Sequence, residues 1–153
     1  MVKRKTKEIS SERNAEKKGV TESIIHVKYS DRKITKFIQF VCKDCRGQTL
    51  AELERQARKE GGLGFAYHFY IDNQGFVFEG RNRYAVAAPE LPAYKTSIYV
   101  LIDTGDKAVT DVASKKKLLN DMQHLAYDEL LEGLTAEFKD AEVSLRSEQS
   151  ANT

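Results

Sequence analysis

The sequence has few cysteines, few prolines, no long apolar run and almost no net charge. No apolar stretch approaches the ~20 residues that cross a bilayer, so we expect no membrane partner. The 25 Lys and Arg residues are balanced by 23 Asp and Glu residues, which argues against nucleic acid as the main partner. With only two prolines, no internal repeat and 153 residues, the chain is expected to form one domain with a substantial core.

The N-terminal segment MVKRKTKEISSERNAEKKG is basic but carries no apolar stretch of the kind found in an export signal. We therefore predict a cytoplasmic protein. Residues 1–20 lack hydrophobic periodicity and are predicted to form a disordered basic arm, followed by a single domain over 21–147 and a flexible tail over 148–153. The lysine clusters are interpreted as solvated surface, and nucleic-acid binding through the arm is the weaker alternative.

The two cysteines, Cys42 and Cys45, form a CxxC motif. A zinc knuckle needs a second pair, and the sequence has none. An apolar run precedes Cys42 and a helix begins near Thr49, which only partly matches a redox site. Two reduced thiols in a connecting segment are favoured over a redox or metal role, and the function of the pair is left open.

Alternating apolar residues predict strands, and turn residues at 72–75 join two of them into a hairpin. Residues 34–41 are compatible with a strand or a helix. The predicted strands cover 23–29, the hairpin 65–78, and 96–102.

Two helices are predicted. Thr49 and Glu52 form a capping box for the first, which the glycines at 61–62 end. The second covers about 111–132. Helices placed between and after strands indicate an α/β sheet covered by helices. One face of the second helix is expected to carry Leu118, Leu119, Met122, Leu125 and Ala126.

Residues 64–86 read GFAYHFYIDNQGFVFEGRNRYAV, with Tyr67-His68-Phe69 before the turn and Glu79-Gly80-Arg81 after it. This stretch resembles the central hairpin of the N-acetylmuramoyl-L-alanine amidases, the family of phage amidase-type lysozymes and peptidoglycan recognition proteins. The resemblance implies an α/β fold with a central mixed sheet flanked by helices. It also implies a zinc ion with three protein ligands and an open position for water.

The resemblance places His26 at the first zinc ligand and Tyr67 at the tyrosine that orients the water or holds the oxyanion. The other functional positions depart from the family pattern. Glu148 stands where the second ligand, a histidine, belongs, and the third ligand and catalytic cation of the family come six to eight positions later, beyond the end of this sequence. Cleft histidines of the family are replaced at Pro89 and near Lys95.

We therefore expect a degenerate zinc site with no cofactor, no metal and no catalysis, in which His26 and Tyr67 are vestigial. If a metal binds, His26 and Glu148 are its expected ligands. His68 should lie on the opposite face of its strand from Tyr67, and His124 lies within the predicted second helix, so neither is expected to replace a ligand.

The sequence thus predicts a catalytically inactive amidase-fold protein, and the resemblance points to phage origin and the host cytoplasm. Its former substrate cleft, between hairpin, first helix and loop 84–95, would bind a host protein or a small anionic ligand, as a regulatory or counter-defence inhibitor. The alternative is an active zinc-dependent amidase, an endolysin, with a rearranged metal site.

Oligomeric state is open, with the apolar stretch Phe37, Phe40 and Val41 as a candidate interface. The predicted cleft residues are His26, Tyr67, Arg81, Arg83, Tyr84, Tyr94 and Lys95.

Overall fold

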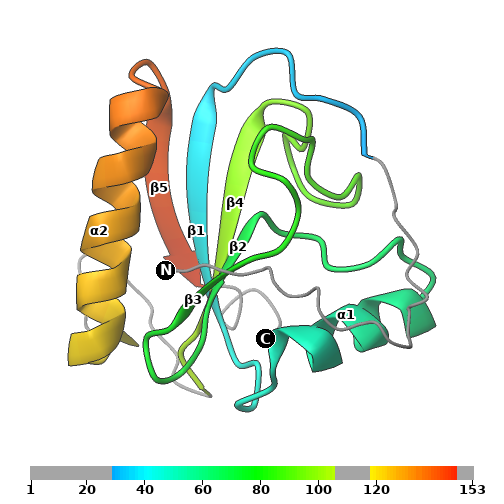
Figure 1. Ribbon diagram of the computed structural model, residues 1–153, viewed down its shortest axis with the longest axis vertical. Coiled ribbons are helices and arrows are strands. Elements are labelled where there is room, and N and C mark those ends of the chain that lie inside the picture. Colours follow the sequence, from blue (N-terminus) through cyan, green and yellow to red (C-terminus); the bar gives the residue numbers. More distant parts are fainter. Residues whose placement is uncertain (1–28, 106–117, 148–153) are drawn as a thin grey trace, which may run out of the picture.

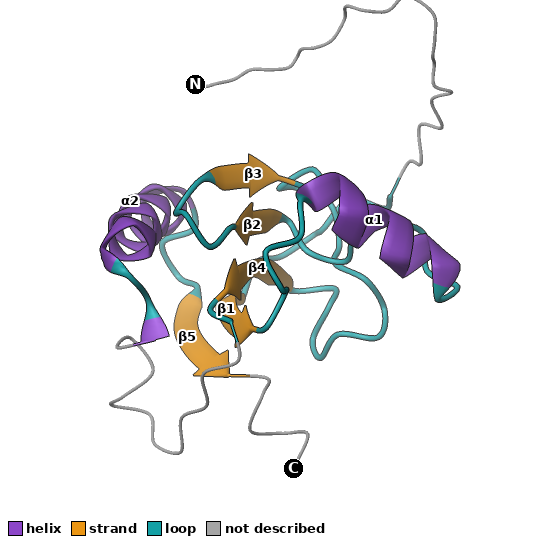
Figure 2. Ribbon diagram, turned by 90° about the horizontal axis from the view of Figure 1, so that it is seen from below, coloured by secondary structure: helices purple, strands orange, loops and turns teal. Residues whose placement is uncertain are grey.

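The computed structural model describes residues 29–105 and 118–147, which form one mixed five-stranded sheet with helices on both sides (Figures 1 and 2). The strand order is β3-β2-β4-β1-β5, in which only β2 and β3 pair antiparallel. This architecture confirms the fold class expected from the sequence. The elements are β1 (Phe37–Lys43), α1 (Leu50–Lys59), β2 (Phe69–Ile71), β3 (Val77–Glu79), β4 (Ser97–Asp103), α2 (Asp121–Glu137) and β5 (Glu142–Ser147).

Residues 34–41, which the sequence left undecided, belong largely to β1. This strand lies between β4 and β5, and its alternate side chains enter two separate cores. Ile38, Phe40 and Cys42 pack on the side of α2, whereas Val41 packs on the side of α1. Phe40 and Val41 are completely buried, so the predicted interface at this stretch is wrong: the apolar run is the centre of the molecule.

Helix α1 begins where its capping box predicts. The Thr49 hydroxyl accepts from Glu52 N, and the Glu52 carboxylate accepts from Thr49 N. The helix ends before Gly61, whose φ of 97° suits glycine. No side chain of α1 is fully buried, so the helix packs only loosely on the sheet.

Helix α2 differs from its prediction in position and in face. It begins at Asp121, with Asn120 as N-cap, and continues to Glu137; residues 111–117 lie outside the described chain. Met122 and Leu125, expected on the inner face, are exposed. The inward side chains are Gln123, Ala126, Tyr127 and Leu134.

The hairpin forms as predicted but with strands of three residues each. The Asp72 carboxylate accepts from the backbone N–H groups of Gln74 and Phe76 and so closes the turn. The predicted strand 23–29, apart from Tyr29, lies outside the described residues, as do the arm 1–20 and the tail 148–153. In the part of the chain that is described, no helix has the length and apolar character of a membrane span.

Candidate binding site

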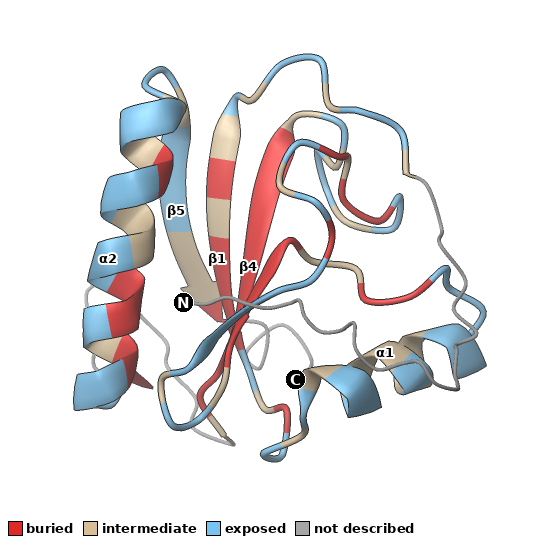
Figure 3. Ribbon diagram, in the orientation of Figure 1, coloured by how far each residue is buried: buried red, intermediate tan, exposed pale blue. Residues whose placement is uncertain are grey.

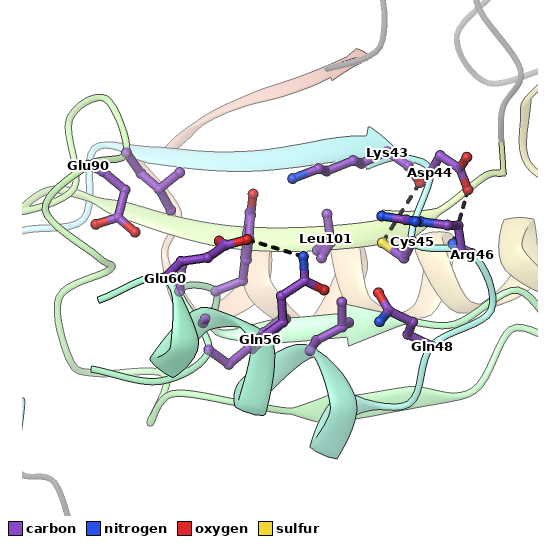
Figure 4. Close-up of a pocket in the computed structure, with 15 residues that line it drawn as sticks. Lys43, Asp44, Cys45, Arg46, Gln48, Gln56, Glu60, Glu90 and Leu101 are labelled. Carbon is purple, nitrogen blue, oxygen red and sulfur yellow. Dashed lines mark hydrogen bonds between the residues drawn. The ribbon is translucent and has the colours of Figure 1, made fainter. Parts of the chain in front are cut away.

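A pocket of about 410 Å³ lies between α1 and the sheet, next to the end of β1 (Figure 4). One wall is the inner face of α1. The opposite wall comes from the β1–α1 connection and from Leu101 of β4, and residues 65–67 and the 90–91 loop close the remaining sides. The lining residues are Lys43, Asp44, Cys45, Arg46, Gln48, Leu53, Gln56, Ala57, Glu60, Phe65, Ala66, Tyr67, Glu90, Leu91 and Leu101.

The pocket exists because α1 presents a mixed face to the sheet. Leu53, Gln56 and Ala57 of α1 and its C-cap residue Glu60 follow the i, i+3, i+4, i+7 spacing of one helical face. In a closely packed helix this face would be apolar and buried, but here two of its four positions are polar. The helix therefore stands away from the core and leaves space beneath it.

The β1–α1 connection is held by the buried Asp103 at the end of β4. Its carboxylate accepts from the backbone N–H of Cys45 at 3.0 Å, of Gly47 at 2.8 Å and of Gly105 at 3.1 Å. Three backbone donors on one carboxylate form a strong, charge-assisted arrangement. The rim of the pocket at 43–47 is therefore fixed in place by the sheet.

Charged groups of both signs surround the pocket. Lys43 is the last residue of β1 and Arg46 belongs to the β1–α1 connection, whereas Glu60 lies just after the end of α1 and Glu90 in the facing loop (Figure 4). Gln56 Nε2 donates to Glu60 Oε2 at 3.2 Å. A ligand with both an anionic and a cationic group would match this lining better than a purely anionic one.

The two thiols are placed differently. Cys42 is buried in the core beneath α2, and Cys45 lines the pocket on the other side of the sheet. Burial, with the nearby Asp103 charge as a second cause, raises the pKa of Cys45 to about 12. The thiol therefore stays protonated at neutral pH and is a poor nucleophile or metal ligand. Because the two side chains belong to different cores, they do not form a dithiol pair.

Of the predicted cleft residues that the structure describes, Tyr67 lines the pocket. Its ring lies 5.4 Å from that of Phe65 and 6.0 Å from that of Tyr99, between centroids. His68, the next residue, is fully buried and faces away. Its Nδ1 accepts from Tyr99 N at 3.0 Å, which leaves Nε2 to donate to Ala85 O at 2.7 Å.

Arg81 lies outside the pocket lining, in a structural role. It is almost fully buried, its Nε donates to Phe65 O at 3.0 Å, and its guanidinium carbon lies 3.8 Å from the centroid of the Tyr29 ring. Arg81 therefore joins the corner after β3 to residues 29 and 65.

Arg83 and Tyr84 contact the far end of α2. Arg83 pairs with Glu137 at 3.4 Å, and the Tyr84 hydroxyl donates to the same carboxylate at 2.5 Å. Tyr94 packs against the core on the α1 side, with Lys95 Nζ 5.9 Å from its ring centroid, and neither lines the pocket. These four residues therefore lie outside the pocket lining, although Tyr94 packs against the same core cluster as Tyr67. His26 and Glu148 lie outside the described residues.

Sequence reasoning missed most of the polar lining. The helical spacing of Gln56 and Glu60 was a usable signal, because two polar residues fell on the face that Leu53 turns inward. Lys43, Arg46 and Glu90 carried no comparable signal, since their positions depend on how loops meet in space.

The described residues do not fit a three-ligand zinc site. Within 29–105 and 118–147, no three His, Cys, Asp or Glu side chains gather where they could hold a metal ion. The strand that precedes the first helix is β1, and it contains no histidine. Its polar member Gln39 donates to Ser97 Oγ at 2.9 Å instead.

Comparisons with known proteins give no matching family model and no match among curated proteins. Among solved structures, the chain is similar to the peptidoglycan recognition protein PGRP-Hd from Alvinella pompejana, with 18% identity, a TM-score of 0.57 and 76% of each chain covered. It is also similar to the N-acetylmuramoyl-L-alanine amidase LysC from Clostridium intestinale URNW, with 16% identity, a TM-score of 0.56, and 79% of this chain and 78% of that chain covered. Drosophila PGRP-SD gives 19% identity and a TM-score of 0.57 over 80% of this chain and 74% of its own. At these identities the likeness shows a shared fold.

Proposed function

Because the chain has the fold of the N-acetylmuramoyl-L-alanine amidases and peptidoglycan recognition proteins, we propose that it is a non-hydrolytic binding protein that holds a small ligand in the pocket beside α1. The observation that carries the proposal is the pocket itself. It has room for a small ligand and has polar and charged side chains on several walls, with Tyr67 at one side. The described residues supply no three-ligand metal centre for hydrolysis.

A peptidoglycan fragment is the ligand class that we propose. One similar structure, at 17% identity and a TM-score of 0.53, is the ectodomain complex of PGRP-LCa and PGRP-LCx bound to tracheal cytotoxin. In the present chain, Lys43 and Arg46 would hold carboxylates of the ligand, and Glu60 and Glu90 would hold an ammonium group. This refines the sequence-based expectation of a small anionic ligand.

The experiment is a calorimetric titration with a soluble N-acetylmuramoyl tetrapeptide that carries both charges. Ala57→Trp places a large ring in the pocket, and Ala51→Trp makes the same change on the exposed side of α1. We expect Ala57→Trp to raise Kd at least tenfold and Ala51→Trp to change it less than about twofold, since one order of magnitude is about 1.4 kcal/mol of binding free energy. Absence of binding to the unmodified chain at millimolar ligand would overturn the proposal.

The sequence also predicts a host protein as partner. The same pair of variants distinguishes binding of such a protein from binding of a small ligand. A protein that covers α1 would contact both faces near the rim, so Ala51→Trp and Ala57→Trp would weaken it alike. In that case the pocket would be part of a wider interface, as in a regulatory or counter-defence inhibitor of a host cytoplasmic protein.

The active amidase is tested by hydrolysis. The proposal expects no release of stem peptide from purified peptidoglycan, with or without added zinc. Release that His26→Ala and Glu148→Gln both abolish would establish the alternative, an enzyme whose metal site includes residues outside the described chain.

A further inference from the structure

The outer face of α2 is acidic along its whole length. The helix contains five carboxylates and no Lys or Arg between its first and last residue. Figure 3 shows this face as exposed, with the buried positions turned toward the sheet. The carboxylates belong to Asp121, Asp128, Glu129, Glu132 and Glu137.

The acidic face also contains an apolar centre. Met122 is 57% exposed and Leu125, one turn later, is 58% exposed. The hairpin turn approaches this centre closely, because a Cβ at Gly75 would lie 2.7 Å from Met122 Cβ. Exposed large apolar side chains next to acidic ones are typical of a surface that another segment covers. We call Met122, Leu125 and the five carboxylates the α2 face.

Most carboxylates of the α2 face have no ion-pair partner among the described residues. Glu137 pairs with Arg83, whereas within the described residues no ion pair involves the other four. The described residues contain thirteen Lys and Arg against sixteen Asp and Glu, whereas residues 1–28 contain eight Lys and Arg against four Glu. Charge is thus divided between a basic N-terminal segment and the described residues, which are net acidic, while residues 106–117 add four Lys against two Asp.

We propose that residues 1–28 of the same chain dock on the α2 face. The lysines and arginines at positions 3–18, which are far enough from Tyr29 to reach α2, would pair with the carboxylates, and the aliphatic stems of their side chains would cover Met122 and Leu125. The chemistry is that of a basic segment on an acidic surface with an apolar centre.

Length and energetics permit the contact. An extended segment of 28 residues reaches up to about 90 Å, several times the ~13 Å radius of gyration of a body of this size. Tethering gives an effective concentration in the millimolar range, so a contact with a Kd of about 1 mM is already half occupied. Each exposed ion pair contributes little, and the contact therefore depends on several pairs acting together.

The test uses the full chain with a nitroxide attached at Ser10→Cys. Cys42 and Cys45 are buried, so the new thiol is the accessible one. At 50 mM salt we expect selective paramagnetic broadening of the amide signals of residues 121–132, and at 500 mM salt we expect most of it to disappear. Broadening spread evenly over the domain, or none at low salt, would overturn the proposal. Broadening seen only when labelled and isotope-enriched chains are mixed would also overturn it, because the segment would then bind a second copy.

A charge-matched pair of variants tests the surface. Asp128→Asn with Glu132→Gln removes two charges from the α2 face, and Asp140→Asn with Glu142→Gln removes two beyond the end of the helix. We expect the first pair to reduce the broadening at least twofold and the second to change it little. An equal reduction by both would show an unspecific attraction and contradict docking on this face.

Discussion

His68 shows how a single buried side chain connects three segments of this fold. Its ring accepts a hydrogen bond from Tyr99 N–H and donates one to Ala85 O. Burial lowers the pKa of His68 to about 4. Because the unfolded chain takes up this proton near pH 6.5, the free energy of unfolding should be constant above that pH and fall as pH drops toward 4. We expect a loss of about 2–3 kcal/mol between pH 7 and 4.5, measured by urea unfolding.

The control for this pH dependence is the other described histidine. His68→Asn should lower stability at pH 7 and flatten the profile below pH 6.5, whereas His124→Gln on α2 should keep the original slope. An unchanged slope in His68→Asn would contradict the role assigned to the buried ring.

The thiols give a second prediction at this scale. Cys42 and Cys45 are both buried, and the raised pKa of Cys45 removes the reactive thiolate. We expect neither to react with a thiol reagent in the native chain at pH 8 within minutes, and both to react in 6 M guanidinium. Rapid modification of one native thiol would show an accessible nucleophile at the pocket.

Residue roles could be predicted from sequence only where contacts are local. Strand alternation placed Tyr67 and His68 on opposite sides, as the structure shows. Arg81, Arg83 and Tyr84 were assigned to the cleft because they follow the hairpin. Their partners, Tyr29 and Glu137, lie about fifty residues away in sequence, and no local pattern indicates such contacts.

At the scale of elements, capping residues predicted the position of a helix more reliably than hydrophobic periodicity did. The Thr49 capping box marked the start of α1 correctly, because it satisfies backbone groups that any helix start leaves free. For α2 the periodicity of the leucines gave a wrong helix start, because Leu118 and Leu119 lie before the helix and are buried there. Gln123 takes an inward position instead, donating to Asp72 O and Asp103 O.

The contact between hairpin and α2 is tested at Gly75. This residue has φ of 89°, and a Cβ there would lie 2.7 Å from the Met122 carbonyl carbon. Gly75→Ala combines backbone strain with overpacking and should cost about 2–4 kcal/mol of unfolding free energy. Gly61→Ala is the matched control, since φ is 97° but no atom lies within 4 Å; it should cost only about 1 kcal/mol. Equal losses of unfolding free energy in the two variants, measured by chemical denaturation, would show that the hairpin and α2 move apart to accommodate the added methyl group.

At the scale of the molecule, the fold was predictable because the 23 residues of the hairpin, 64–86, resemble the central hairpin of a known family. The pocket was not, because it depends on the distance between α1 and the sheet. That distance follows from the polar residues on the inner face of α1 together with the Asp103 contacts that hold the connection. Neither determinant lies in the hairpin that identified the fold.

The effect of zinc on stability is a test at the scale of the whole chain. The ligands that the family resemblance implies come from the first predicted strand and from the C-terminal segment, which are far apart in the sequence. In the structure β1 provides Gln39 at its polar position, already bonded to Ser97, and no three-ligand cluster exists among the described residues. Zinc at 100 µM, bound with a Kd of about 1 µM, would raise the free energy of unfolding by about 2.7 kcal/mol. For a chain of this length that corresponds to a rise in Tm of about 8 °C. We expect calorimetric scans with zinc, with EDTA and with neither to agree within about 1 °C. A zinc-dependent rise that His26→Ala removes would instead locate a metal site outside the described residues and favour the hydrolytic alternative.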